Sequence, residues 1–336
     1  MAVVEIIRRL AALILLCLGG VYLVWPGSPV VVLKALPDTP KPDSDAAERR
    51  VDLPAPAWPD LVAKITQNSP DIAPHTWETA LPRYVFPADH RAFADFHART
   101  LRFATDPATG TWFSLLRAYP QEIYGLPQQF LYPLRWPGLG LIGAGLALYI
   151  LLPRPGSNEH WLRYSRGPAV IAPDLLGLVL TPFFLALPVA VMANTAPGAV
   201  FTPTQGGWIW LYIIFSLLAL LGIALLVAGL RYAVRGYRLL PHGLQIRTLR
   251  GRQDYSWSSL QAWESYNTNT SRRLGKLLLL TGSFSAIGLG LALQNAPERG
   301  LRLHFRGRAR PLEIMANHLP GFADITLAVR DHAPHS

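Results

Sequence analysis

The sequence contains a single cysteine, Cys17, in 336 residues. One thiol excludes an intramolecular disulfide framework and any zinc or iron–sulfur site built from several cysteines. Charge is also scarce: 15% of the residues are charged, where about 25% is usual for a soluble globular protein. The chain is 51% hydrophobic and has a mean hydropathy of +0.23. The composition therefore predicts a multi-span membrane protein and argues against wholesale disorder.

The sequence also lacks the short motifs that mark common catalytic sites. It has no G-x-S-x-G elbow, no H-E-x-x-H pair and no P-loop, and Gly138-Leu139-Gly140 falls inside an apolar run. His90 and His97 are seven residues apart, whereas metal ligands on one helix are more persuasive at i and i+4. We therefore expect no catalytic residue, metal ion or cofactor, and a protein that is not an enzyme.

An apolar run from Leu10 to Trp25 follows Arg8 and Arg9. A membrane span needs about 20 mostly apolar residues, with a lower limit of about 17. A cleaved signal peptide is the alternative, but residues 26–32 lack an A-x-A cleavage site. We expect residues 1–25 to form an uncleaved anchor helix.

Three further spans are expected within residues 138–230. Arg135 and Arg154 bracket 18 uncharged residues, which predict the second span. The next uncharged stretch, from Leu175 to Leu230, has 56 residues and is too long for one helix. Prolines and glycines cluster between Asn194 and Gly207 and divide it. The third and fourth spans are then predicted at about 171–193 and 208–230.

The arginines next to the spans predict the orientation. They form three groups: Arg8 and Arg9; Arg154, Arg163 and Arg166; and Arg231, Arg235 and Arg238. If four spans alternate, all three groups lie on one side, which the positive-inside rule makes cytoplasmic. Both termini are then cytoplasmic and residues 26–137 lie outside. A fifth apolar run, 277–293, is diluted by glycine, serine and threonine, and we expect it to be buried or to touch the membrane rather than cross it.

The extracytoplasmic segment divides by composition. Residues 26–59 contain eight prolines, which is typical of a semi-extended linker. In residues 60–137, Phe93, Phe96 and Phe103 recur with helical spacing. We expect this second part to be mostly helical.

Residues 231–336 hold 15 Lys+Arg and 6 Asp+Glu, a net +9 of the total +10. Here the pattern indicates strands. Pro241-His242-Gly243 suits a tight turn between two of them, with Leu244 and Ile246 inward and Arg247 outward. Alternation predicts further strands at 301–305 and 312–314. A closing helix from about Pro320 would direct three apolar side chains towards the sheet: Phe322, Ile325 and Val329.

These residues carry a resemblance to a known family. The strand–turn–strand rhythm of 237–257, the following Trp257-Ser258-Ser259-Leu260, and the tail from Leu312 to Phe322 resemble the bacterial PH-like domain membrane proteins, over roughly 95 residues. The resemblance implies a curved antiparallel sheet capped by one helix, with a binding or assembly role. The stretch 266–297 departs from the compact pattern. The expected fold is thus integral membrane α-helical, with four spans and a cytoplasmic β-rich PH-like domain, in the bacterial inner (plasma) membrane.

The function expected from this architecture is a membrane scaffold or a regulatory and assembly protein. Its basic domain would bind anionic lipid headgroups or a protein partner. The candidate contact residues are Arg247, Arg302, His304, Arg306, Arg308 and Arg310. The alternative for these residues is a solvated basic face that only satisfies the positive-inside rule.

The sequence also bears on three other functions. Nucleic acid is not expected as a partner, because no recognition helix accompanies the arginines. A membrane enzyme that acts on a lipid or envelope polymer through the extracytoplasmic segment is the alternative to a scaffold. Transport is disfavoured because Asp174, at one end of a span, is the exception among spans otherwise without ionisable residues.

Overall fold

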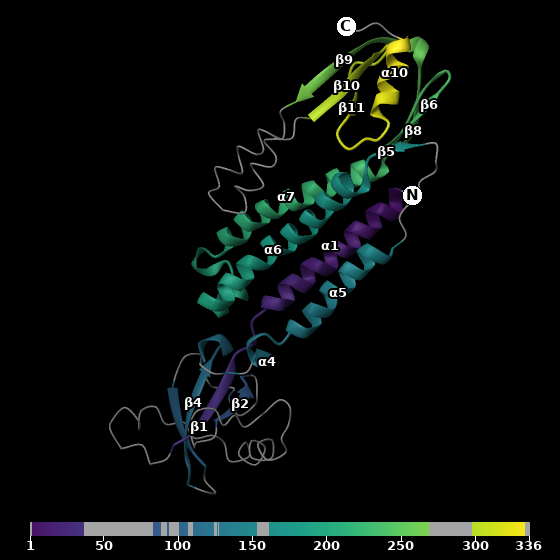
Figure 1. The fold of residues 1–336 in the computed structure, drawn as a ribbon. Helices are drawn as coiled ribbons and strands as arrows, with labels where there is room; N and C mark the ends of the chain where they lie inside the picture. The colour runs from purple at the N-terminus through teal and green to yellow at the C-terminus, as the bar shows by residue number, and fades with distance from the viewer. Residues whose placement is uncertain are drawn as a thin grey trace. The chain divides into compact units, whose positions relative to one another are not determined.

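The computed structural model of the protein describes residues 2–36, 83–88, 93, 101–106, 110–123, 126, 128–152, 161–268 and 298–332 (Figure 1). The chain divides into two compact units. The first comprises Met1–Leu16, Ala144–Thr181 and Leu218–Ser336. The second comprises Cys17–Gly143 and Pro182–Leu217. The apolar run at 277–293 lies outside the described residues.

Four long apolar helices are α1 (Ala2–Val24), α5 (Arg135–Leu151), α6 (Ala172–Thr195) and α7 (Ile209–Val234). By length and composition, three of the described helices could cross a membrane: Val3–Val24, Gly167–Thr195 and Ile209–Val234. This confirms the first, third and fourth predicted spans as membrane-length helices. The second is helical but only 17 residues long. The helices are compatible with a multi-pass membrane protein.

The predicted break between the third and fourth spans is confirmed. Two short 3-10 helices, η4 (Pro197–Val200) and η5 (Gln205–Gly207), connect α6 to α7. Gly206 and Gly207 have φ angles of +69° and +76°, which residues with a Cβ rarely adopt. Pro182 and Pro188 lie inside α6, which continues through both.

In the second unit, four antiparallel strands form a sheet in the order β2-β1-β4-β3. They are β1 (Val30–Ala35), β2 (Arg83–Pro87), β3 (Leu101–Thr105) and β4 (Trp112–Ala118), followed by η2 (Pro120–Glu122) and α4 (Gln128–Leu131). The sequence predictions for this region were wrong where the structure describes it. The predicted linker 26–59 begins with a strand inside the sheet, and the segment 60–137, expected to be mostly helical, contributes three strands. The β-branched run Val30-Val31-Val32 favours a strand, and its valines are buried.

The first unit contains the β-rich domain. One antiparallel sheet has the order β5-β6-β7-β8, and another has the order β11-β10-β9. The strands are β5 (Leu162–Arg163), β6 (Gly236–Leu240), β7 (Gly243–Thr248), β8 (Gly251–Ser256), β9 (Leu260–Thr268), β10 (Glu298–Phe305) and β11 (Leu312–Met315). Between β8 and β9 lies η6 (Trp257–Ser259), and α10 (Phe322–His332) ends the domain.

Most of the predicted C-terminal pattern is confirmed. β6 and β7 form the expected hairpin, with Leu244 and Ile246 buried. Ile325 and Val329 of α10 are buried in the same hydrophobic core, and Phe322 packs against it while partly exposed. Together these contacts hold α10 on the core of the β-rich domain.

The predicted boundary at residue 231 was wrong. β5 pairs with β6 through Arg163 and Gly236, although it precedes α6 in the chain. Tyr164, next to β5, lies in the core with its hydroxyl 3.2 Å from that of Tyr237. Burial is the main cause that raises the pKa of Tyr237, and the neighbouring Tyr164 adds to it. The phenol of Tyr237 therefore stays neutral. The domain thus includes β5 and Tyr164, which precede α6 in the chain, as well as the described C-terminal residues.

Candidate functional site

The six candidate contact residues divide between two sheets. Arg302 and His304 lie on β10, in the three-stranded sheet, and Arg306, Arg308 and Arg310 follow that strand. Arg247 lies on β7, in the four-stranded sheet. The structure therefore places two separate basic groups where the sequence indicated one face.

Arg302 is held by carboxylates on both neighbouring strands. Its Nε donates to Glu313 on β11 at 2.9 Å, and its guanidinium lies 3.4 Å from Glu264 on β9. The hydrogen bond to Glu313 is the main cause that raises the pKa of Arg302. His304 Nε2 lies 3.8 Å from the same Glu264 oxygen. Such exposed pairs add little to stability, but they lower the positive potential of this strand.

The residues after β10 form a second part of that group. Arg308 donates to the hydroxyl of Tyr255, and its guanidinium lies 5.2 Å from the centre of the Tyr255 ring. Arg306 and Arg310 are exposed. The predicted lipid-facing group therefore retains two exposed arginines and one that is stacked on a tyrosine.

Arg247 belongs to a different cluster, which the sequence did not reveal. The strand register places Arg163, Gly236, Arg247 and Arg252 opposite one another across β5, β6, β7 and β8. Directly opposite residues in antiparallel strands share one face of the sheet. Trp161 lies on this face too: a Cβ at Gly236 would be 3.3 Å from its ring, and Arg252 lies 5.8 Å from its centre.

Positive charge is crowded around Arg163. Its pKa is lowered, first by burial and then by Arg247 and Arg166. Neighbouring like charges repel one another, and an anion placed among these arginines would relieve the repulsion. The guanidinium group presents donors in a planar fork that matches the oxygens of a phosphate. The cluster is therefore suited to bind a phosphate group.

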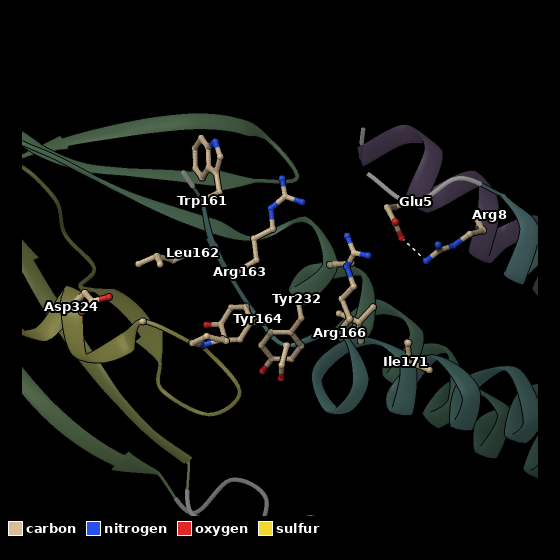
Figure 2. Close-up of a pocket in the computed structure, with 15 residues that line it drawn as sticks. Glu5, Arg8, Trp161, Leu162, Arg163, Tyr164, Arg166, Ile171, Tyr232 and Asp324 are labelled. Atoms are coloured by element: carbon tan, nitrogen blue, oxygen red, sulfur yellow. Dashed lines mark hydrogen bonds and ion pairs between the residues drawn. The ribbon is translucent and has the colours of Figure 1, made fainter. Parts of the chain in front are cut away.

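A cavity of about 490 Å³ lies beside this cluster. Its walls come from α1, the β5 segment, the helical turn just before α6 (Gly167–Ile171), the end of α7 and the beginning of α10 with the turn before it, all within the first unit. Figure 2 shows the side chains of Arg163 and Arg166 between Trp161 and the Glu5–Arg8 ion pair of α1. Tyr164 and Tyr232 also line it, with ring centres 4.8 Å apart.

A buried ionic network lies within the same unit. Arg9 of α1 binds Asp174 of α6 through two contacts, of 2.9 Å from Nε to Oδ1 and 2.7 Å to Oδ2. The hydroxyl of Tyr149 on α5 donates to Asp174 at 2.6 Å. A Cβ at Gly229 on α7 would lie 2.2 Å from Asp174 Oδ1. Four helices thus meet at one carboxylate.

Glu5 completes this network. It pairs with Arg8 at 2.7 Å and with Arg9, and the Arg8 guanidinium lies 4.8 Å from the centre of the Tyr149 ring. Two carboxylates therefore face two guanidinium groups. Since Asp174 is 0% exposed and the two arginines at most 4%, removal of one member would leave a buried charge without its counterion, which is strongly destabilising.

This network corrects two inferences from the sequence. Arg8 and Arg9 lie inside α1 rather than before a span, so they are not simple cytoplasmic flanks. The apolar helices also carry buried ionisable side chains: Glu5, Arg8, Arg9 and Asp174. A scarcity of such residues therefore no longer argues against transport. One feature of the sequence did indicate this network: Asp174 is an acid at the end of a long apolar run, and an acid buried among apolar helices requires a partner.

No group of three or more histidine, cysteine or acidic residues in the described part of the chain is placed to hold a metal ion. Comparisons with protein-family models, curated proteins and solved structures found no match to this chain.

Proposed function

We propose that this protein is a multi-pass membrane scaffold or regulatory protein that binds the phosphate of an anionic lipid headgroup at the arginine-lined cavity. In this proposal α1, α5, α6 and α7 cross the bilayer, and the β-rich domain is cytoplasmic and PH-like. The 17 residues of α5 meet the lower limit for a span. The two antiparallel sheets and closing helix support the resemblance to PH-like domains.

One observation carries the ligand assignment: the strand register places Arg163, Arg247 and Arg252 in one row across the sheet, and Arg163 and Arg166 line the cavity beside that row. A fold that gathers cations in this way stores repulsion that an anionic ligand removes. Each basic residue near an anionic membrane surface contributes about 1 kcal/mol of attraction. Arg8, Arg163 and Arg166 line the cavity together with two acidic residues, Glu5 and Asp324, and Glu5 is paired with Arg8 and Arg9. On β10, by comparison, two glutamates flank the single arginine, Arg302.

The position of the cavity supports a lipid ligand. Val170 and Ile171, in the helical turn just before α6 (Gly167–Ile171), and Tyr232 and Ala233, near the end of α7, line it. These are the ends of membrane-length helices, where headgroups lie if the helices span the bilayer. Tyrosine and tryptophan are favoured at that level because their rings are amphipathic. Trp161, Tyr164 and Tyr232 provide such rings.

The test compares two double variants of the full-length protein in detergent. Arg163→Gln/Arg247→Gln should reduce the binding of phosphatidylglycerol at least tenfold, measured by native mass spectrometry. Arg306→Gln/Arg310→Gln removes the same charge from the other basic group and should leave binding within twofold. Loss only in the second variant would return the site to the residues that follow β10. If neither variant changes binding, or the native protein binds no anionic lipid, the proposal fails and a protein partner becomes the better explanation.

A further inference from the structure

An apolar groove of about 150 Å³ lies between α1 and α7. Ile6, Leu10 and Leu13 form one wall. Ile223, Leu226, Val227 and Leu230 form the other. Arg9 also borders the groove, with its guanidinium bound to Asp174. Because Leu10 is 55% exposed and Val227 40% exposed, the groove opens on the outer surface of the helices.

The groove and the arginine-lined cavity are lined by residues that are near neighbours in sequence on α1 and α7. On α1, Ile6 borders the groove and the preceding residue, Glu5, borders the cavity. On α7, Leu230 borders the groove, and Ala233, three residues later, borders the cavity. Three residues of helix advance about 4.5 Å. Measured along the helix axes, the nearest lining residues of the two spaces are therefore within about one helical turn of each other.

We infer that the groove and the cavity together bind one phospholipid molecule, with an acyl chain along the groove and the phosphate at the arginines. The inference rests on the proposed function and adds a second element of recognition. An apolar groove followed by a cationic cavity repeats the order of groups in a phospholipid, in which the acyl chain precedes the phosphate. A soluble phosphate ester has no group for the groove, and a purely apolar molecule has none for the arginines.

The inference predicts a dependence on the acyl chain. Since a longer acyl chain makes more van der Waals contacts along the groove, the native protein should bind long-chain phosphatidylglycerol more tightly than the short-chain form. Both should bind more tightly than glycerol 1-phosphate, the soluble headgroup. A site that reads the headgroup alone would give equal affinities for the three ligands.

Filling the groove tests this dependence. In the full-length protein, Val227→Trp should lower the affinity for long-chain phosphatidylglycerol at least tenfold and leave that for glycerol 1-phosphate unchanged. Leu10→Trp, on the opposite wall, should act in the same way. Leu220→Trp is the control, because Leu220 is a 55% exposed residue of α7 outside the groove. Competition against a fluorescent phosphatidylglycerol measures all of these affinities.

The outcomes separate this inference from the proposed function. If both groove variants bind long-chain lipid like the native protein, while Arg163→Gln/Arg247→Gln does not bind, the headgroup site stands and the groove assignment is wrong. If Leu220→Trp weakens binding as much as the groove variants, the chain contacts the helices non-specifically and the inference also fails. Loss restricted to Val227→Trp and Leu10→Trp supports it.

Discussion

The buried ion pair between Arg9 and Asp174 should make the stability of the protein sensitive to single substitutions at either residue. Asp174→Ala leaves the buried Arg9 without its bidentate partner, and we expect a loss of about 3–5 kcal/mol in stability. Thermal unfolding in detergent measures it. Replacement of both residues, Arg9→Met/Asp174→Leu, removes the charges together and should cost less than the sum of the two single changes. Strict additivity would show that the pair is not coupled.

Gly229 tests how closely the helices meet at this carboxylate. A Cβ there would lie 2.2 Å from Asp174 Oδ1 and 3.2 Å from a backbone oxygen of α6's preceding turn, that of Val170. Gly229→Ala should therefore destabilise the protein by about 1–3 kcal/mol through overpacking. Gly140→Ala is the matched control, because nothing lies within 4 Å of a Cβ at that position. Equal melting temperatures for the two variants would contradict the close approach.

At the scale of elements, α10 is held to the β-rich domain by one face. Ile325 is 0% exposed, whereas Leu327 on the same helix is 56% exposed. Ile325→Asp buries an unpaired charge, which is costly, and should deplete the folded protein. Leu327→Asp should be tolerated. The amount of each variant in membranes and its resistance to limited proteolysis measure this difference. Similar results for the two variants would contradict the packing of α10 against the core.

The sequence predicted those elements whose pattern is local. The alternation around Leu244 and Ile246, and the proline and glycine cluster before α7, depend on neighbours in the chain, and the structure confirms both. β5 could not be predicted in the same way, because its two residues acquire a strand conformation only by pairing with β6. The cation cluster of Arg163 and Arg247 depends on that pairing, so it was missed with it.

The buried network was missed for a related reason. Arg9 and Asp174 are 165 residues apart, and no local period connects them. Each was interpreted against its own neighbours, Arg9 as a positive flank and Asp174 as a residue at a span end. Their meeting requires α1 and α6 to pack together, which is a property of the tertiary fold.

At the scale of the whole molecule, the network changes which residues support the orientation. Arg8 and Arg9 are buried beside Glu5 and Asp174, so they contribute little free positive charge. The orientation then depends on the arginines between α5 and α6 and on those after α7: Arg154, Arg163, Arg166, Arg231, Arg235 and Arg238. These still place both groups on one side if four helices cross the membrane.

Reporter fusions test this orientation in cells. Four crossings with cytoplasmic termini predict cytoplasmic reporter activity after Arg166 and after Ser336. They predict extracytoplasmic activity at Asn68 and at Gly198, since one and three crossings precede these positions. If α5 does not cross, Asn68 and Arg166 would report the same side, because α5 is the helix between them. A cytoplasmic reporter at Asn68 would instead show that α1 does not cross outwards. The Asn68 and Arg166 fusions therefore decide whether α5 crosses the membrane. With 17 residues, it is the shortest of the four long apolar helices described.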